Sequence, residues 1–288
     1  MYDSGKSEIF AASGNAYVAG GPTPTLTVIS DSNNTIIATI TYATFGNSAY
    51  DFPYQPKEMA YDSGKGEIFI ADPGSGYHPG NVYIMSDSNN TVFTYIGLAQ
   101  GGGNNPGELV YDSGMGEIFV ANTGSNTVSV ISDSNNTVVA NVTVGSNPYG
   151  VAYDPSKGEI FVYNEGDGTV SVISDNSNTV VANITGIAVQ SNYLSTIAYD
   201  SGKGMVLAGN AVISDSTDAV VAQLPANTGN LVYDSGKGET FAATGSALSV
   251  FTDSTVPELS GATLFAVATA MTAMTACAVI IARRNRHR

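Results

Sequence analysis

The chain of 288 residues has no tryptophan, one cysteine and only two histidines. Cys277 lies in the apolar C-terminal stretch, so no disulfide framework can form in the rest of the chain. His287 is also in the tail, which leaves His78 as the only histidine before it. Copper and haem sites need several His, Cys or Met ligands, and a Ser-His-Asp triad needs a placed histidine. The sequence therefore predicts no catalytic residues, no metal and no cofactor.

Positive charge is also scarce, because Lys and Arg number 10 against 25 Asp and Glu. All the arginines lie after Ala282, at Arg283, Arg284, Arg286 and Arg288. The remaining chain is strongly acidic and would repel a phosphate backbone, so nucleic acid is not an expected partner.

An internal repeat organises most of the chain. A Tyr-Asp pair recurs at Tyr2, Tyr61, Tyr111, Tyr153, Tyr199 and Tyr233. It alternates with a Ser/Thr-Asp mark at Asp31, Asp87, Asp133, Asp175, Asp215 and Asp253. The best-kept unit, from Tyr111 to Tyr153, has a period of about 42 residues, which is typical of four-stranded propeller blades.

Each unit contains short runs of β-branched and aromatic residues bounded by Gly, Asn, Asp and Ser. In the third unit, the runs predict strands over 109–111, 118–121, 127–131 and 137–144. Unit five is shortened where Gly209-Asn210 joins two strands directly, and unit six stops after three strands. The Asp-Ser-Gly and Ser-Asn-Asn segments are typical of tight turns. We expect an all-β protein: a β-propeller of six recognisable four-stranded blades over residues 1–254, with the last blade incomplete.

Met1 falls in the middle of a unit, and no basic and apolar leader follows it. We expect the natural start to lie upstream, with a full-length form of seven blades left open.

The third unit resembles the YVTN-family β-propeller repeat. The resemblance rests on Phe119–Asn122, Ser125–Ile131, Thr137–Ala140 and Gly145–Ala152, and similar motifs extend over about residues 1–255. That family is common among archaeal surface-layer-associated proteins. The resemblance implies a propeller displayed at the cell surface, but it implies no particular activity.

The C-terminal segment differs in composition from the repeats. A linker over residues 255–258 precedes 24 uncharged residues, 259–282, which as a helix would cross a hydrocarbon core of about 30 Å. The basic tail, 283–288, should then remain in the cytoplasm. We expect a single transmembrane helix that anchors an extracellular propeller to the cell membrane.

Five Asn-X-Thr sequons predict N-glycosylation of an extracellular chain, at Asn33, Asn89, Asn135, Asn141 and Asn183. Insertions at Gly21–Pro24, Asn47–Pro56 and Pro73–Gly80 fall on one predicted face of the propeller, as binding-face insertions often do. The aromatic residues and histidine expected on this candidate binding face are Tyr50, Phe52, Tyr54, Tyr77, His78, Tyr149 and Tyr193. Loop packing alone is the competing interpretation.

These features favour a non-enzymatic binding or structural protein of the cell envelope, whose partner is an envelope or surface-layer protein or a glycan. The alternative is a calcium-dependent, lactonase-like hydrolase with Asp and Asn ligands near the axis. The first-turn aspartates recur in all units, and we expect no acid that departs from the repeat to mark a catalytic site. A calcium-stabilised adhesion module using Asp167 is a further alternative.

Overall fold

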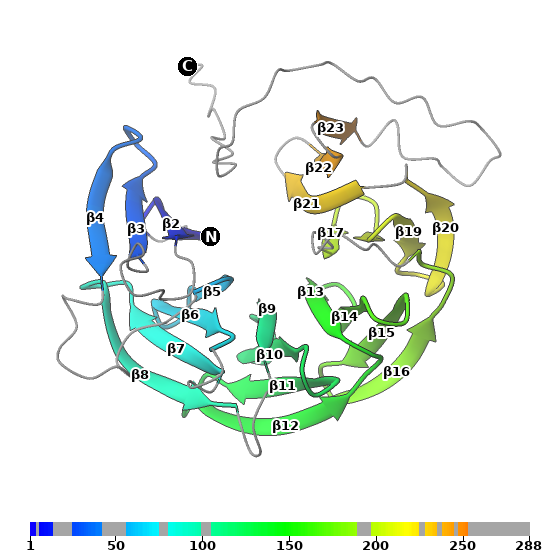
Figure 1. Cartoon of the computed structure of the whole chain (residues 1–288), viewed down its shortest axis with the longest axis horizontal. Coiled ribbons are helices and arrows are strands. Elements are labelled where there is room, and N and C mark those ends of the chain that lie inside the picture. Colours follow the sequence, from blue (N-terminus) through cyan, green and yellow to red (C-terminus); the bar gives the residue numbers. More distant parts are fainter. Residues whose placement is uncertain are drawn as a thin grey trace.

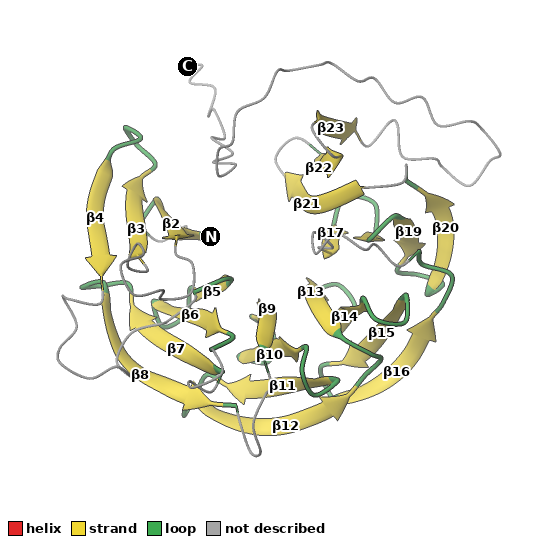
Figure 2. Ribbon diagram, viewed as in Figure 1, coloured by secondary structure: helices red, strands yellow, loops and turns green. Residues whose placement is uncertain are grey.

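The structure is a computed structural model that describes residues 1–3, 6–13, 25–41, 56–74, 80–98, 105–188, 197–224, 228–234, 238–244 and 247–252. Within these ranges every regular element is a β-strand (Figure 2). The 23 strands form six antiparallel sheets, of which five have four strands and the last has three. The all-β class and the repeated unit predicted from the sequence are therefore confirmed.

We call the sheets blades one to six in chain order. Blade one contains β1 (Tyr2–Asp3), β2 (Glu8–Ser13), β3 (Thr25–Ser30) and β4 (Ile36–Thr41). Blade two contains β5 (Met59–Asp62), β6 (Glu67–Asp72), β7 (Asn81–Ser86) and β8 (Thr91–Gly97). Blade three contains β9 (Pro106–Asp112), β10 (Glu117–Asn122), β11 (Thr127–Ser132) and β12 (Thr137–Thr143).

Blade four contains β13 (Pro148–Asp154), β14 (Glu159–Asn164), β15 (Thr169–Ser174) and β16 (Thr179–Ile184). Blade five contains β17 (Ile197–Asp200), β18 (Met205–Ala208), β19 (Ala211–Ser214) and β20 (Ala219–Gln223). Blade six contains β21 (Thr228–Asp234), β22 (Glu239–Thr244) and β23 (Ala247–Thr252). The short link at Gly209-Asn210 and the three-stranded sixth sheet agree with the sequence expectation.

The blades are arranged around a central opening (Figure 1). The first strand of each blade is innermost, and the later strands follow outward in chain order. The described strands do not form a closed ring, because an interval separates the strands of blade six from those of blade one (Figure 1). Residues 259–282, expected to cross the membrane, lie outside the described residues, and the described residues include no helix long and apolar enough to span a bilayer.

Neighbouring blades bury apolar side chains against one another. In β14, Ile160 and Val162 pack with blade three, whereas Phe161 and Tyr163 pack with blade five. All four of these side chains are fully buried. Because successive side chains of a strand point to opposite faces, an inner blade needs apolar residues at both alternating positions. This requirement explains the continuous apolar runs seen in the sequence.

Polar contacts link the blades at the turns that follow the first and third strands. The Tyr111 hydroxyl donates to Asp133 Oδ2 at 3.1 Å within blade three. Lys65 of blade two donates to the backbone carbonyl of Asp133, and its Nζ lies 3.8 Å from Asp133 Oδ1. Lys6 makes the corresponding contact with Asp87. The recurring Tyr, Lys and Asp residues are therefore part of the blade interfaces.

The turn residues adopt the conformations that their types favour. Asp112 Oδ1 accepts hydrogen bonds from the amides of Gly114 at 2.7 Å and Met115 at 3.2 Å. Gly116 follows with φ of 67°, in the left-handed region that glycine enters without a steric penalty. In blade one the same turn position is held by Ser7, with φ of 57°. Ser7 therefore retains a backbone strain that glycine relieves in the other blades.

We predict that Ser7→Gly stabilises the protein by about 1 kcal/mol, because a left-handed backbone costs an L-residue about that much. The matched control is Gly116→Ser, which should destabilise, since a Cβ at Gly116 would lie 2.8 Å from Asp133 Oδ2. Urea unfolding midpoints of the two variants and the parent measure both effects. An unchanged or lowered midpoint for Ser7→Gly would contradict the assignment of strain to this turn.

Candidate functional site

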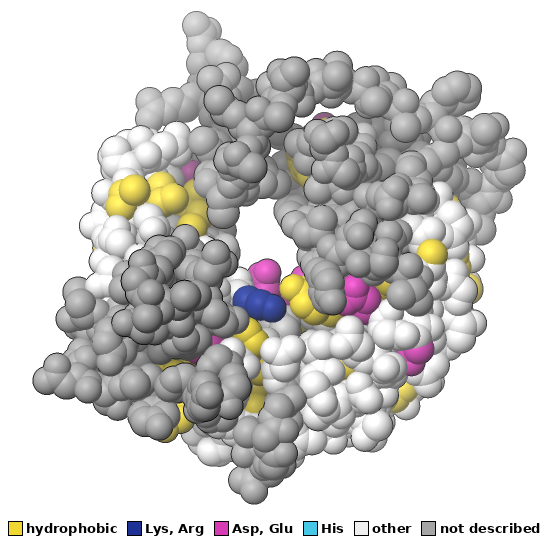
Figure 3. All heavy atoms as spheres, in the orientation of Figure 1, with side chains coloured by type: hydrophobic (Ala, Val, Ile, Leu, Met, Phe, Trp, Pro, Cys, Tyr) yellow, Lys and Arg dark blue, Asp and Glu magenta, His cyan; other side chains and the backbone are white. Residues whose placement is uncertain are grey.

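Two glutamates occupy the same repeat position in blades two and three: Glu108 lies in β9, and Glu58 directly precedes β5. Glu58 and Glu108 each lie three positions before the Tyr-Asp pair, within the segments Pro56-Lys57-Glu58 and Pro106-Gly107-Glu108. Blade four has Gly150 at this position, after Pro148-Tyr149. The space-filling view shows Asp or Glu side chains and a Lys or Arg side chain at the edge of the central opening (Figure 3). The acidic pair belongs to adjacent blades, two and three.

Glu108 reaches from β9 to the innermost strand of the next blade. Its side chain is only 9% exposed, and Oε2 accepts a hydrogen bond of 3.2 Å from the backbone amide of Val151. A Cβ added to Gly150 would lie 2.9 Å from the same oxygen. The absence of a side chain at Gly150 therefore makes room for the Glu108 carboxyl group.

Desolvation raises the pKa values of both carboxyls. Burial raises the pKa of Glu108 well above its usual value, the charge of Glu58 raises it further, and the Val151 amide lowers it. Glu58 is exposed, yet partial desolvation raises its pKa too, against the lowering effects of the chain's α-amino group and Lys57. A carboxyl that keeps its proton donates a hydrogen bond as well as accepting one.

Tyr149 joins this cluster from β13. Burial raises the pKa of its hydroxyl, and the charges of Glu108, Glu58 and Glu165 raise it further. Glu165 is itself buried, and its Oε2 accepts a bond of 3.4 Å from Asn147 Nδ2. The cluster thus offers carboxyl and phenol groups that can donate and accept hydrogen bonds. These groups suit hydroxyl-bearing ligands.

Of the residues expected on the binding face, the structure describes Tyr149 and places it, half-buried, in this cluster. The other six lie outside the described residues: Tyr50, Phe52, Tyr54, Tyr77, His78 and Tyr193. The expectation that no acid departing from the repeat marks a catalytic site stays a prediction, and Glu58 and Glu108 are the acids on which it depends. In the sequence, these two glutamates can be recognised because only two units have a Pro-X-Glu segment before the Tyr-Asp pair.

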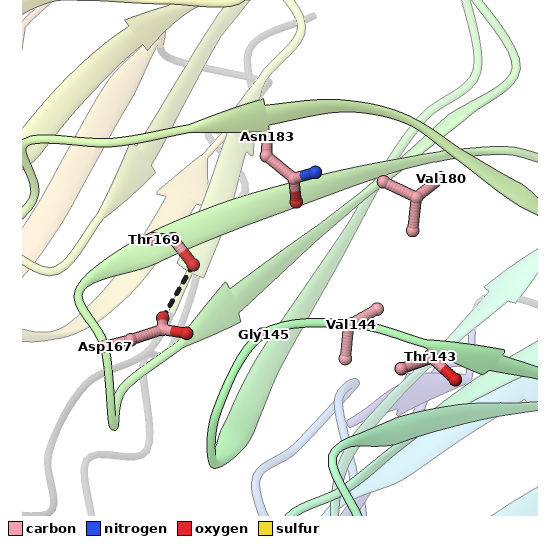
Figure 4. A pocket seen from close by; sticks show the side chains of 7 residues that line it. All are labelled: Thr143, Val144, Gly145, Asp167, Thr169, Val180 and Asn183. Atoms are coloured by element: carbon pink, nitrogen blue, oxygen red, sulfur yellow. Dashed lines mark hydrogen bonds between the residues drawn. The ribbon is translucent and has the colours of Figure 1, made fainter.

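A depression of about 350 Å³ lies between blades three and four (Figure 4). It is lined by Thr143, Val144, Gly145, Asp167, Thr169, Val180 and Asn183. Asp167 Oδ1 accepts a bond of 2.7 Å from Thr169 Oγ1, and Oδ2 accepts one of 2.8 Å from the Ser146 amide. Asp167 therefore already bonds within the protein through both oxygens. Among the described residues, no group of three or more His, Cys, Asp or Glu is arranged to hold a metal.

The fold is similar to that of known structures. Hydrazine synthase of Kuenenia stuttgartiensis matches with a TM-score of 0.64 at 13% identity, over 81% of this chain and 71% of that chain. A functionally unknown protein from Desulfotomaculum acetoxidans DSM 771 matches with a TM-score of 0.63 at 15% identity, over 88% of this chain and 81% of that chain. No family model and no curated protein matches the sequence. The sheets and these neighbours define a propeller-like all-β protein, and likeness at such identities shows the fold alone.

We predict that Glu108→Gln makes stability less sensitive to pH. A carboxyl whose folded pKa is raised contributes stability that is complete below its unfolded pKa of about 4.3 and is lost as pH rises through the folded value. Above the unfolded pKa, the free energy of unfolding of the parent should therefore fall by up to about 1.4 kcal/mol per pH unit. That of the Gln variant should fall less. Urea unfolding from pH 4 to pH 9 measures the difference.

Glu58→Gln provides a second arm, because removing its charge should lower the pKa of Glu108 and shift the sensitive range to lower pH. Parallel pH profiles for the parent and both variants would contradict this description of the cluster.

Proposed function

We propose that this protein is a membrane-anchored propeller of the cell surface that acts as a non-enzymatic binding or structural protein of the envelope. The proposal combines the propeller-like fold with the uncharged stretch at 259–282 and its basic end, 283–288. The resemblance of residues 119–122, 125–131, 137–140 and 145–152 to YVTN repeats supports an archaeal, surface-layer-associated protein. The acidic composition suits a domain exposed to solvent.

The observation that carries a binding role is the cluster of Glu58, Glu108 and Tyr149 at the central opening. Other units have no acid at this position, with Gly150 and Asn230 in its place, and burying Glu108 carries a desolvation cost. The raised pKa of Glu108 favours a neutral, hydrogen-bonding group. A neutral, hydroxyl-rich glycan of the envelope is therefore the ligand class that we propose.

The sequons add support for extracellular display, because all five asparagines have exposed side chains. Asn33, like Asn89 and Asn135, lies in a turn between the third and fourth strands. Its Oδ1 accepts bonds from the Thr35 amide at 3.1 Å and from Thr35 Oγ1 at 2.7 Å. Asn141 and Asn183 instead lie within the outermost strands, and Ser129 Oγ donates to Asn141 Oδ1 at 2.8 Å. We propose that the turn sequons are the preferred glycosylation sites.

A second candidate function is hydrolysis. Two carboxyls in unequal environments, Glu58 exposed and Glu108 buried, resemble in kind the pairs that divide acid and base roles. The calcium-dependent form of this alternative gains no support from the described residues, which show no metal-binding group. Hydrolysis of a glycan or lactone that disappears in Glu58→Gln and Glu108→Gln, with binding retained, would favour the enzyme.

Protease treatment of intact cells tests the proposed location. We expect release of peptides from residues 1–252 before lysis, with glycan mass on peptides containing Asn33, Asn89 or Asn135, because these sites face solvent. Mass spectrometry of the released peptides measures both. Resistance on whole cells followed by cleavage after lysis would reject surface display.

Titration of the full-length chain with purified neutral envelope glycans tests the binding role. We expect Glu108→Ala to weaken binding about tenfold, the value of one hydrogen bond of about 1.4 kcal/mol, whereas Glu108→Gln, which keeps a neutral donor and acceptor, should bind like the parent. Glu159→Gln, away from the central opening, is the matched control. Equal loss in the Ala and Gln variants would indicate a cationic ligand, and no loss in either would remove the site from the proposal.

A further inference from the structure

In three blades, a lysine side chain donates a hydrogen bond to the backbone carbonyl of an aspartate in the following blade. The pairs are Lys6 with Asp87, Lys65 with Asp133 and Lys157 with Asp215. Carboxyl groups also lie near the ammonium group: Lys65 Nζ is 3.8 Å from Asp133 Oδ1, and Lys157 Nζ is 3.2 Å from Glu159 Oε2. We call this group of one carbonyl and its neighbouring carboxyls, at a blade interface, the ammonium site.

Blade three departs from this pattern at a single residue. The lysine position is occupied by Met115, whereas the other five units have lysine there. The backbone of the turn is the same, because Asp112 Oδ1 accepts hydrogen bonds from the amides two and three residues later, just as Asp62 Oδ1 does in blade two. The Met115 side chain is 50% exposed, so core packing does not require a methionine in place of the lysine.

The acidic groups of the ammonium site are retained between blades three and four. Asp175 of blade four corresponds to Asp133, and Glu117 of blade three corresponds to Glu159. Asp112 is fully buried, and its carboxyl group faces Asp175. Its Oδ2 has no hydrogen-bond partner among the described residues. At this interface the repeated arrangement therefore keeps its acids and lacks its lysine.

Three carboxyls without a lysine give this interface an excess of negative charge. The ion pairs formed by the described residues do not include Asp112, Glu117 or Asp175. Burial raises the pKa of Asp175, and the charge of Asp112 raises it further. Burial, followed by Asp112, also raises the pKa of the Tyr153 hydroxyl, so this phenol keeps its proton and adds no charge. A cation bound between these groups would relieve the repulsion.

The same buried carboxyl oxygen occurs at interfaces that keep their lysine. In the part of the chain that the structure describes, Oδ2 of Asp62 and Oδ2 of Asp154 also lack a hydrogen-bond partner. Lys65 and Lys157 bring a positive charge to those two interfaces. The difference at Met115 is thus the missing ammonium group and not the arrangement of the acids.

We propose that the interface between blades three and four binds a primary alkylammonium group of another molecule, at the position that a lysine occupies at three other interfaces. An ammonium group has three N–H donors, and the site offers it the Asp175 carbonyl and the carboxyl groups of Glu117 and Asp175. The thioether of Met115 is flexible and polarizable, and it packs against the alkyl chain of the ligand. The acidic composition of the chain raises the local concentration of such cations.

Other cations fit the site less well. A divalent metal takes several oxygen ligands, and no group of three or more His, Cys, Asp or Glu among the described residues is arranged to hold one. A quaternary ammonium has no N–H donor and cannot reproduce the hydrogen bond of the lysine. A proton shared by Asp112 and Asp175 would also reduce the repulsion, and its signature is stability that rises as pH falls.

Thermal unfolding of the full-length chain with n-butylammonium chloride tests the site. At constant ionic strength and about pH 8, a concentration about five times Kd should raise Tm by about 2–4 °C. Tetramethylammonium at the same concentration carries the same charge and should give no such rise. Met115→Lys supplies the ammonium group from the chain itself, so this variant should lose the response. Lys65→Met creates a second site of the same kind and should increase the response.

Val139→Lys is the matched control for charge, because Val139 is 51% exposed on the outermost strand of the same blade. This variant should respond like the parent. A spectroscopic measurement on the parent does not depend on how well the variants fold. The Met115 methyl resonance, assigned with Met115→Leu, should shift as n-butylammonium is added.

The proposal is overturned if n-butylammonium and tetramethylammonium raise Tm equally, if Met115→Lys responds like the parent, or if the Met115 methyl resonance does not move. A parent that ignores both cations but gains stability as pH falls would show that a shared proton occupies the site instead. Competition by spermidine and by N-acetyl-lysine amide identifies the source of the ammonium group. The competitor that displaces n-butylammonium at the lower concentration shows whether a free polyamine or a protein lysine side chain is the ligand.

Discussion

The apolar contact between successive blades is the interaction on which the structure depends. A blade has four short strands at most, and no blade holds enough apolar surface within itself to fold alone. Stability arises when Phe119, Ala121 and Val130 of one blade meet Ile160, Val162 and Ile173 of the next. Burial of each such side chain contributes about 1.5–3 kcal/mol. The repeat is therefore a solution to covering both faces of every sheet.

The turns between strands add a polar layer to the same interfaces. The Tyr111 hydroxyl donates a hydrogen bond to Asp133 Oδ2, and burial, followed by the neighbouring Asp62 and Asp133 carboxylates, raises the pKa of Tyr111. Asp175 likewise faces Asp112, and burial followed by that neighbouring charge raises its pKa. Tyr61 and Tyr199 make the same bond with Asp87 and Asp215, so these turn aspartates hold structural hydrogen bonds. Glu58 and Glu108 lie outside these turns.

The sequence predicted the fold well because its signals are local. The alternation of Thr127–Ile131 and the turn formers around it place β11 (Thr127–Ser132) almost to the residue. The first strand of that blade was predicted from Leu109 but begins at Pro106, because pairing continues beyond a bulge to Asn122. Glu58 and Glu108 were missed, since their importance depends on the innermost strand facing the central opening. The exposure of Ile36 and Val250 could not be predicted from the sequence either, because the same residue type is buried where a neighbouring blade covers it and exposed where none does.

Glu108 of blade three and Gly150 of blade four occupy the same repeat position, and the two residues fit together. Glu108 could not occupy its place if Gly150 had a side chain, and the Val151 amide would lack this acceptor without Glu108. A random substitution in a repeat would be expected to affect one blade, and a new charged side chain would be expected to lie in solvent. Glu108 is buried, and Gly150 in the next blade leaves space for its carboxyl group. Glu58 in the preceding blade raises the pKa of Glu108. Three adjacent blades thus contribute to one cluster, and the proposed binding role rests on this arrangement.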